Sequence, residues 1–277
     1  EENFVATVVW FKIFAPKNTA KYFSEDHDYV IVYARNKEIW RPNLLPRTDE
    51  ADARYSNPDN DPRGPWTSSD LTGRNYYSEG QYKITSPSGQ AFAPPRGRYE
   101  DNRIWWGEKG ENMPRLKRFL SDVQQGIVPR TIWAYEDVGH TQEAKKELLG
   151  RVDFEHTENV LNSVKPSRLI QRMLRLATDP MAGDLVLDFF AGSAATAQAV
   201  LQQNDEDGGN RRFLMVQIPE PLPIVEPSLS TIADMGKQRI HRVIAEMRVD
   251  QEGQLPLEPR GTPEDLGFRV FELAPST

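Results

Sequence analysis

The C-terminal half of the sequence alternates between helical and strand-like patterns. Residues 167–177 and 194–203 carry apolar side chains at helical spacing, whereas 185–190 and 213–217 are nearly continuous apolar runs. Such runs are typical of central strands that are covered on both faces. A strand, a helix and a second strand in succession predict a parallel βαβ unit. The pattern therefore favours an α/β fold with a mostly parallel sheet.

Further elements are predicted at both ends of the chain. Residues 4–10 and 29–34 are rich in β-branched and aromatic side chains and predict strands, the second of them buried. Residues 231–247 have the spacing of a long amphipathic helix, and residues 266–273 predict a closing strand. Both ends therefore belong to the ordered α/β structure.

The segment 41–97 has a different texture. Pro, Gly, Asn, Asp and Arg dominate it, which indicates loops and short hairpins, yet it holds too many aromatic residues for a linker. Two interpretations remain open. The rings pin irregular loops to a core, or some Arg and aromatic side chains face a nucleic acid, where guanidinium groups hold phosphates and rings stack on bases.

A helix is predicted after this segment, over residues 114–126, with a proline near its first turn and a glycine after its last. The apolar residues at helical spacing are Leu116, Phe119, Leu120 and Val123. The basic residues on the opposite face are Arg115, Lys117 and Arg118. This face is either a solvated surface, which is the usual case, or a contact to DNA.

Composition excludes several classes of protein. The 41 acidic and 34 basic side chains give a net charge of −7, which argues against coating nucleic acid by bulk attraction. The absence of cysteine excludes a disulfide scaffold, a thiol nucleophile and an iron–sulfur cluster. The absence of cysteine fits the cytosol, so we expect a cytoplasmic protein. No apolar run reaches about 18 residues, the length that a membrane-spanning helix needs, so we expect no segment that spans a membrane and no membrane partner.

Histidine carries little functional signal. The four histidines lack the spacing of metal ligands, so we predict no metal site. His140 is a candidate general base because of its residue type alone, but no catalytic partner lies near it in the sequence. Thr141 is expected to cap a short helix over residues 143–149.

The informative motif runs from Leu187 to Ser193. Asp188 stands at the carboxyl end of a predicted central strand, and Gly192 follows in a turn that leads into a helix. Open α/β sheets bind ligands at this edge, and a carboxylate there accepts hydrogen bonds from a cationic amine. The motif lacks the glycine pattern of dinucleotide-binding proteins, which disfavours a nicotinamide-dependent oxidoreductase.

The surroundings of this motif resemble a known family. Residues 186–193, preceded by Lys165-Pro166 and followed by 207–221, resemble DNA methyltransferases with this order of motifs. More narrowly, the chain is similar to the modification subunit of Type III restriction–modification systems. The other similar blocks are residues 23–36, 61–66, 138–146 and 265–271.

The resemblance implies a Rossmann-like fold that binds S-adenosylmethionine, with an incomplete, mostly parallel sheet. Residues 1–40 would end the catalytic half, 41–150 would form a loop-rich target-recognition region inserted in the fold, and 151–277 would bind the cofactor. The implied cofactor-binding residues are Asp188, Phe189, Phe190, Gly192, Ser193, Lys165, Pro166 and Gln217. The implied partners are double-stranded DNA, a second copy of the chain in a homodimer, and a restriction subunit.

Two positions depart from the family pattern. The family commonly has Gly-Thr where this chain has Ala194-Ala195, so two β-carbons narrow the turn, although Thr196 keeps a hydroxyl. Related enzymes hold the ribose hydroxyls with an acidic residue where Gln217 stands here. Gln bonds a hydroxyl more weakly than a carboxylate does, and Glu220 is a possible substitute.

The catalytic tetrapeptide of the family, Asp or Asn followed by two prolines and an aromatic residue, is missing. Residues 93–96 have the prolines but neither flanking residue. Because the chain opens at Glu1 without a methionine, we interpret it as a piece of a longer protein and predict no catalytic residue within it. Our leading interpretation is that the whole protein is a DNA methyltransferase that acts on adenine N6. The alternatives are a cytosine-amine methyltransferase and a non-catalytic module that recognises DNA or binds a restriction subunit.

Overall fold

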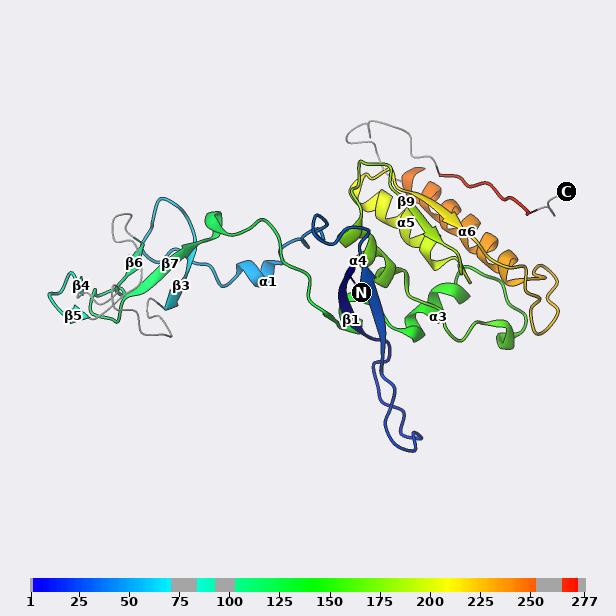
Figure 1. Ribbon diagram of the computed structural model, residues 1–277, viewed down its shortest axis with the longest axis horizontal. Helices are drawn as coiled ribbons and strands as arrows, with labels where there is room; N and C mark the ends of the chain where they lie inside the picture. Colours follow the sequence, from blue (N-terminus) through cyan, green and yellow to red (C-terminus); the bar gives the residue numbers. More distant parts are fainter. Residues whose placement is uncertain (1, 71–83, 93–102, 253–265, 274–277) are drawn as a thin grey trace. The chain divides into compact units, whose positions relative to one another are not determined.

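The computed structural model describes residues 2–70, 84–92, 103–252 and 266–273. The chain divides into two compact units (Figure 1). Unit 1 comprises Glu1–Asn43 and Pro129–Thr277, and unit 2 comprises Leu44–Val128. Residues 129–150, which the sequence analysis groups with the loop-rich region, therefore belong to unit 1.

Unit 1 contains five of the strands in the described part of the chain and most of the helices. Its strands are β1 (Phe4–Phe11), β2 (His27–Tyr33), β8 (Ile132–Trp133), β9 (Leu185–Asp188) and β10 (Arg212–Met215). Its α-helices are α2 (Tyr135–Val138), α3 (Thr141–Leu149), α4 (Ser167–Ala177), α5 (Ala195–Asp207) and α6 (Ile232–Glu252), and η3 (Thr157–Asn159) is a 3-10 helix. No helix within the described ranges combines the length and apolarity that a bilayer crossing requires.

The strands of unit 1 form two small sheets. In one, β1 pairs antiparallel with β2 and parallel with β8. In the other, β9 and β10 pair in parallel, with Leu187 opposite Leu214, and α5 connects them. The predicted α/β class and the predicted parallel βαβ unit over residues 185–217 are confirmed, as a mixed α/β structure with small mixed and parallel sheets.

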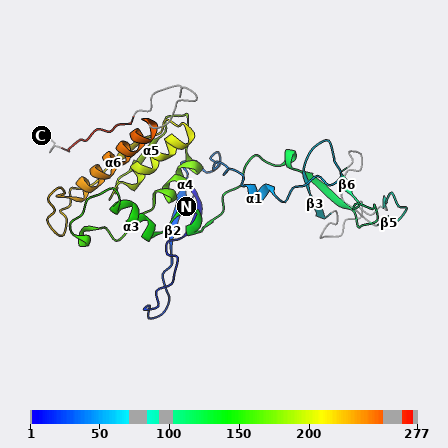
Figure 2. The same ribbon diagram turned by 180° about the vertical axis from the view of Figure 1, so that it is seen from behind.

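Helices cover one face of each sheet. Phe213 and Met215 of β10 pack against a core made by α5 and α6. Val30 and Val32 of β2 pack with Leu169 of α4, whose other apolar side chains meet α5. Figure 2 shows α4, α5 and α6 from behind, stacked beside one another. Helix α4 therefore joins the two sheets into one body.

The prediction that β9 is covered on both faces is wrong for the described residues. Leu187 is 55% exposed and its cross-strand neighbour Leu214 is 49% exposed, while the alternate residues Val186 and Phe213 are packed. Helices α4, α5 and α6 pack against the alternate residues Val186, Phe213 and Met215. An apolar run indicates that a strand is hydrophobic on both faces. It does not show whether other elements of the protein cover both of those faces.

Two further predictions for unit 1 fail. Strand β2 is not buried, because Tyr29, Ile31 and Tyr33 alternate outward and only the other face meets α4. Residues 266–273 form no strand and join no ladder in the described part of the chain. Leu266 and Phe268 are held instead by side-chain packing on α6, so the apolar pattern reports a contact with a helix.

Unit 2 is built mainly from short strands. They are β3 (Trp66–Asp70), β4 (Ile84–Thr85), β5 (Ala91–Phe92), β6 (Ile104–Trp105) and β7 (Arg115–Phe119), accompanied by the helix α1 (Asp49–Asp52) and the 3-10 helix η2 (Leu120–Asp122). Strand β7 is central and pairs antiparallel with β3 and β6. The prediction of a helix over 114–126 is therefore wrong. Pairing of β7 with β3 and β6 outweighs the helical spacing of its apolar residues.

The strand conformation separates the three basic residues of β7. Arg115 and Arg118 are exposed, whereas Lys117 is only 2% exposed. The Lys117 ammonium group forms ion pairs with Asp59 and, at 2.9 Å, with Asp61, so the prediction that the three share one face is wrong. Arg63 reaches Asp61 through two hydrogen bonds of 2.9 and 2.8 Å. This buried charge cluster is a structural centre of unit 2.

Candidate functional site

Asp188 is the last residue of β9, and its carboxylate is fixed by the turn that follows. Oδ1 accepts a hydrogen bond of 3.1 Å from the backbone N–H of Phe190, and Oδ2 accepts one of 2.6 Å from the Thr196 hydroxyl. Each carboxylate oxygen can accept two hydrogen bonds. One acceptor position on each oxygen therefore remains for a ligand, and an amine is the donor that a carboxylate prefers.

The turn between β9 and α5 adopts left-handed backbone at Gly192 (φ 53°) and at Ala194 (φ 58°). The Gly192 N–H donates a 2.8 Å hydrogen bond to Gln217 Oε1. Gln217 follows β10, so its side chain ties the ends of the two parallel strands together. Its amide oxygen is engaged by the turn, which leaves the amide Nε2, a donor to the Ile218 carbonyl at 3.1 Å, as its second polar group.

Ser193 faces the interior. Its hydroxyl and carbonyl accept hydrogen bonds of 3.0 and 3.4 Å from Arg239 of α6, which is completely buried. Arg239 also donates to Gln198 at 2.7 Å and to Glu147 of α3 at 3.3 Å. Burial lowers the pKa of Arg239 to about 10, opposed by the Glu147 charge. Ser193 is therefore held in place by a buried cation that fixes the turn from behind.

Glu147 extends this network to the start of α4. Its carboxylate accepts hydrogen bonds of 3.2 and 3.0 Å from the backbone N–H and the hydroxyl of Ser167, next to Pro166. Pro166 packs closely enough on Gly139 that a β-carbon there would approach to 2.9 Å. The Pro166 segment and the Asp188 turn are thus tied to one buried network through Glu147 and Arg239.

Two aromatic rings stand outside the turn. Phe189 and Phe190 are exposed, and their ring centroids lie 5.0 Å apart. Phe189 continues the exposed alternation of Leu185 and Leu187, and Phe190 follows it in the turn. Exposed rings next to a carboxylate and a glycine turn suit a ligand with a flat aromatic part.

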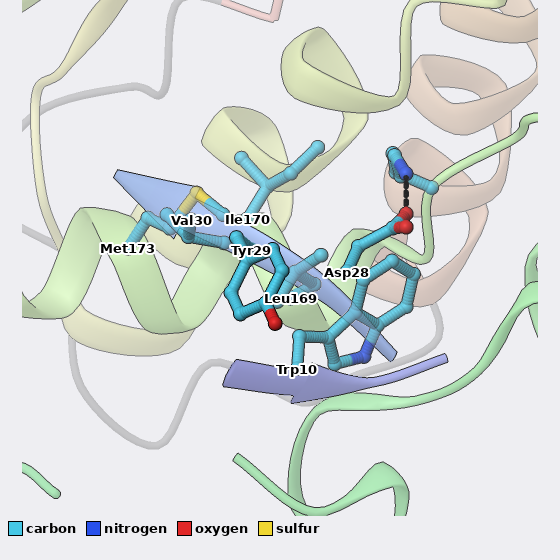
Figure 3. A pocket seen from close by; sticks show the side chains of 8 residues that line it. Trp10, Asp28, Tyr29, Val30, Leu169, Ile170 and Met173 are labelled. Carbon is cyan, nitrogen blue, oxygen red and sulfur yellow. Dashed lines mark hydrogen bonds and ion pairs between the residues drawn. The ribbon is translucent and has the colours of Figure 1, made fainter. Parts of the chain in front are cut away.

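Lys165 lines a second feature of unit 1, a cavity of 320 Å³ between α4 and β2. Figure 3 shows Trp10 and Asp28 at one end of it and Met173 at the other. The Lys165 ammonium group pairs with Asp28 at 2.8 Å and lies 4.9 Å from the Trp10 ring centroid. Asp28 also pairs with Lys12 at 2.8 Å. Partial burial acts to raise the pKa of Asp28, but hydrogen bonds from the two lysines lower it overall.

His140 has a structural role. Its Nδ1 accepts a 3.2 Å hydrogen bond from the backbone N–H of Glu143, so His140 and not Thr141 caps α3. Sequence reasoning also missed Arg239, Glu147 and Asp28. Each stands among polar residues that resemble an ordinary solvated surface, and none has a local pattern that distinguishes it.

The eight residues that the sequence singles out thus fall into two groups. Asp188, Phe189, Phe190, Gly192, Ser193 and Gln217 gather at the carboxyl ends of β9 and β10. Lys165 is engaged with Asp28, and Pro166 adjoins the buried network. A carboxylate and a glycine turn at the ends of parallel strands are typical of α/β domains that bind nucleotide-like ligands.

The comparison with protein families narrows this class. The model of the DNA methylase family matches residues 1–218. The chain therefore belongs to the DNA methylase family.

Individual relatives agree with this assignment. The StyLTI Mod subunit of a Type III restriction-modification enzyme from Salmonella typhimurium is 30% identical over 293 aligned residues, which cover 100% of this chain and 42% of the relative. The EcoPI Mod subunit from Escherichia phage P1 is 27% identical and covers 80% of this chain, and the EcoP15I Mod subunit from Escherichia coli is 24% identical and covers 99%. The chain spans 42%, 40% and 46% of the lengths of these three relatives.

Proposed function

We propose that this chain is the cofactor-binding part, together with a DNA-recognition unit, of a DNA methyltransferase that transfers a methyl group from S-adenosylmethionine to adenine N6. We further propose that the whole protein is the modification subunit of a Type III restriction–modification system. The observation that carries the proposal is the fixed Asp188 carboxylate at the strand ends of a chain that belongs to the DNA methylase family.

The residues at the turn fit this cofactor. The two acceptor positions left on Asp188 suit the methionine amine, and the exposed rings of Phe189 and Phe190 suit the flat adenine. A β-carbon at Gly192 would meet no atom closer than 3.9 Å, so the space beside this glycine is open. A ligand can therefore approach the backbone there. Gln217 Nε2 is the proposed partner of the ribose, and Lys165 and Pro166 would line the methionine end.

When bound, S-adenosylmethionine supplies an activated methyl group on a sulfonium sulfur. The role of the chain is to hold and orient that cofactor, because transfer depends mainly on positioning. The acceptors that hold the amine of a flipped base belong, in the family, to the missing tetrapeptide. No such tetrapeptide occurs in the 277 residues, so we propose that the acceptors lie in the remainder of the whole protein.

The proposed partners are double-stranded DNA, which unit 2 would recognise, and a restriction subunit. The relatives are Mod subunits of Type III restriction-modification enzymes, and this similarity supports a system with both components. The exposed Arg115 and Arg118 on β7 suit phosphate contacts. We also propose that the protein is a cytoplasmic homodimer, as its resemblance to Type III modification subunits suggests.

Titration calorimetry with S-adenosylmethionine tests the proposal. Asp188→Asn should weaken binding by about tenfold to a hundredfold, since a hydrogen bond to a charged group contributes about 1.5–3 kcal/mol. The matched control is Asp184→Asn, four residues earlier and just before the opposite end of β9. Equal affinity of both folded variants and the unaltered chain would place the cofactor elsewhere. Analysis of the methylated base made by the whole protein distinguishes adenine N6 from a cytosine amine.

A further inference from the structure

The connection between β1 and β2, residues 12–26, is a hairpin that we name the arm. It extends away from the helices of unit 1 in both opposite views (Figures 1 and 2). Its two sides are held by hydrogen bonds from the Lys12 N–H to the Asp26 carbonyl and from the Lys17 N–H to Ser24 Oγ, both 2.9 Å. A turn at its tip is closed by a 3.0 Å bond from the Ala20 N–H to the Lys17 carbonyl. The arm is therefore a defined element.

The arm exposes large aromatic side chains. Phe23 is 91% exposed and Tyr22 is 81% exposed, and Phe14, at 52%, lies nearer the base beside His140. Single exposed hydrophobic residues are common on protein surfaces. Two almost fully exposed rings at neighbouring positions of one short hairpin, Tyr22 and Phe23, are typical of a contact surface.

The arm carries exposed lysines towards its tip. Residues 12–26 contain three lysines and two acidic residues, Glu25 and Asp26, which both lie at the β2 end, so residues 13–24 hold Lys17 and Lys21 and no acidic residue. Lys12 is occupied by its ion pair with Asp28. Lys17 and Lys21 are exposed and form no ion pair within the described ranges, and the Lys21 ammonium lies 5.2 Å from the Tyr22 ring centroid. The tip thus presents cations and flat rings together.

We propose that the arm is a contact site for double-stranded DNA, separate from the recognition unit. Lys17 and Lys21 bind phosphates, while Tyr22 and Phe23 pack against sugars or insert between base steps. The inference rests on the proposed function for the presence of DNA. Exposed cations beside aromatic rings suit a polyanion whose sugars and base steps accept apolar side chains. An apolar protein surface would leave Lys17 and Lys21 without a counter-charge. Rings and phosphate contacts do not read base sequence, so this contact contributes affinity without specificity.

The test uses the full 277-residue chain and a fluorescein-labelled duplex of mixed sequence, with anisotropy measured between about 50 and 200 mM salt. The double variant Lys17→Ala/Lys21→Ala should reduce the slope of log affinity against log salt by about 1.8, since each phosphate contact contributes about 0.9. Tyr22→Ala/Phe23→Ala should weaken binding by about tenfold with little change in slope, since the rings release no counterions.

The matched control is Lys146→Ala/Phe271→Ala, which removes an exposed lysine on α3 and an 81% exposed ring outside the arm. It should bind DNA as the unaltered chain does. All variants should bind S-adenosylmethionine with unchanged affinity, which shows that they fold and separates this test from that of the cofactor site.

Arm variants that bind DNA with the affinity and salt slope of the unaltered chain would overturn the inference and leave the proposed function intact. The inference also fails if the arm variants change the oligomeric state without changing DNA affinity, since the arm is then a contact between copies. A chain that binds the cofactor but no duplex overturns it as well.

Discussion

The Thr196 hydroxyl donates a 2.6 Å hydrogen bond to Oδ2 of Asp188. Thr196 lies in the first turn of α5, whereas Asp188 ends β9, so this bond spans the turn that connects them. The bond fixes the direction of the carboxylate before any ligand arrives. The helix thereby takes part in shaping the candidate site, and Thr196, which is nearly buried, does so without facing a ligand.

Replacement of Thr196 should therefore reduce affinity for S-adenosylmethionine. Thr196→Val keeps the shape but removes the donor, and we expect a loss of about threefold to tenfold, since a typical net hydrogen bond contributes about 0.5–1.5 kcal/mol. Thr196→Ser keeps the hydroxyl and should bind within about twofold of the unaltered chain. Calorimetry measures both. Equal losses in the two variants would indicate a packing effect and not an oriented carboxylate.

Ala194 offers a test of backbone strain. It has φ 58° and ψ 36°, a left-handed conformation that costs a residue with a β-carbon about 1–2 kcal/mol. Its β-carbon lies against Gly236 of α6. Ala194→Gly should raise the free energy of unfolding by about 0.5–1 kcal/mol, after the greater freedom of glycine in the unfolded chain is counted. Ala195→Gly, one residue further and inside the helix, should lower it by about the same amount. Urea unfolding compares the two, and a loss in both contradicts the strain argument.

The Asp188 motif could be predicted from the sequence because it is local. A strand, a carboxylate, a glycine turn and a helix follow one another within about 20 residues of chain, and the structure contains them in that order. The hydrogen bond from the Gly192 N–H to Gln217 and the Arg239 network were not predictable, because each joins elements that only the packing of α5, α6 and the two strands brings together.

Strand β7 shows where local patterns mislead. Its apolar residues fit helical spacing, but the period of two that places Lys117 and Phe119 on one buried face is the one realised. The partners that decide it, Asp59 and Asp61, lie far away in the sequence, and Trp66 opposes Phe119 in the ladder. A lysine in a basic run resembles a solvated residue until such partners are known.

The Lys117 cluster should make unit 2 sensitive to acid. Hydrogen bonds from Arg63, opposed by burial and helped by Lys117, hold the pKa of Asp61 well below its ordinary value. The stabilisation is therefore complete above the unfolded pKa of about 3.9 and is lost as pH falls below it. At neutral pH, Asp61→Asn should lower the free energy of unfolding by about 2–3 kcal/mol, because Lys117 is left partly uncompensated.

Hydrogen exchange of the β3–β7 amides measures this effect. The difference between the unaltered chain and Asp61→Asn should shrink as pH falls below about 4. Asp70→Asn serves as a control, because its exposed ion pair with Arg115 should contribute less than about 1 kcal/mol. A difference between the Asp61 variant and the unaltered chain that stays constant with pH would show that the carboxylate charge is not its source.

The 277-residue chain should transfer no methyl group, even where it binds S-adenosylmethionine. Transfer requires fixed acceptors around the amine of the flipped base, in line with the activated methyl group. Asp188 is engaged by Thr196 and Phe190 and, in our proposal, by the methionine amine, and no Asp/Asn-Pro-Pro-aromatic unit occurs in the sequence. A tritium-transfer assay on mixed-sequence DNA should give only background counts with this chain.

If the reading frame upstream of Glu1 encodes Asp-Pro-Pro-Tyr or a close variant, the longer protein should be active in the same assay, and Asp188→Asn should reduce its activity. Robust transfer by the 277-residue chain would mean that a group within it performs the chemistry that we assign to the missing tetrapeptide.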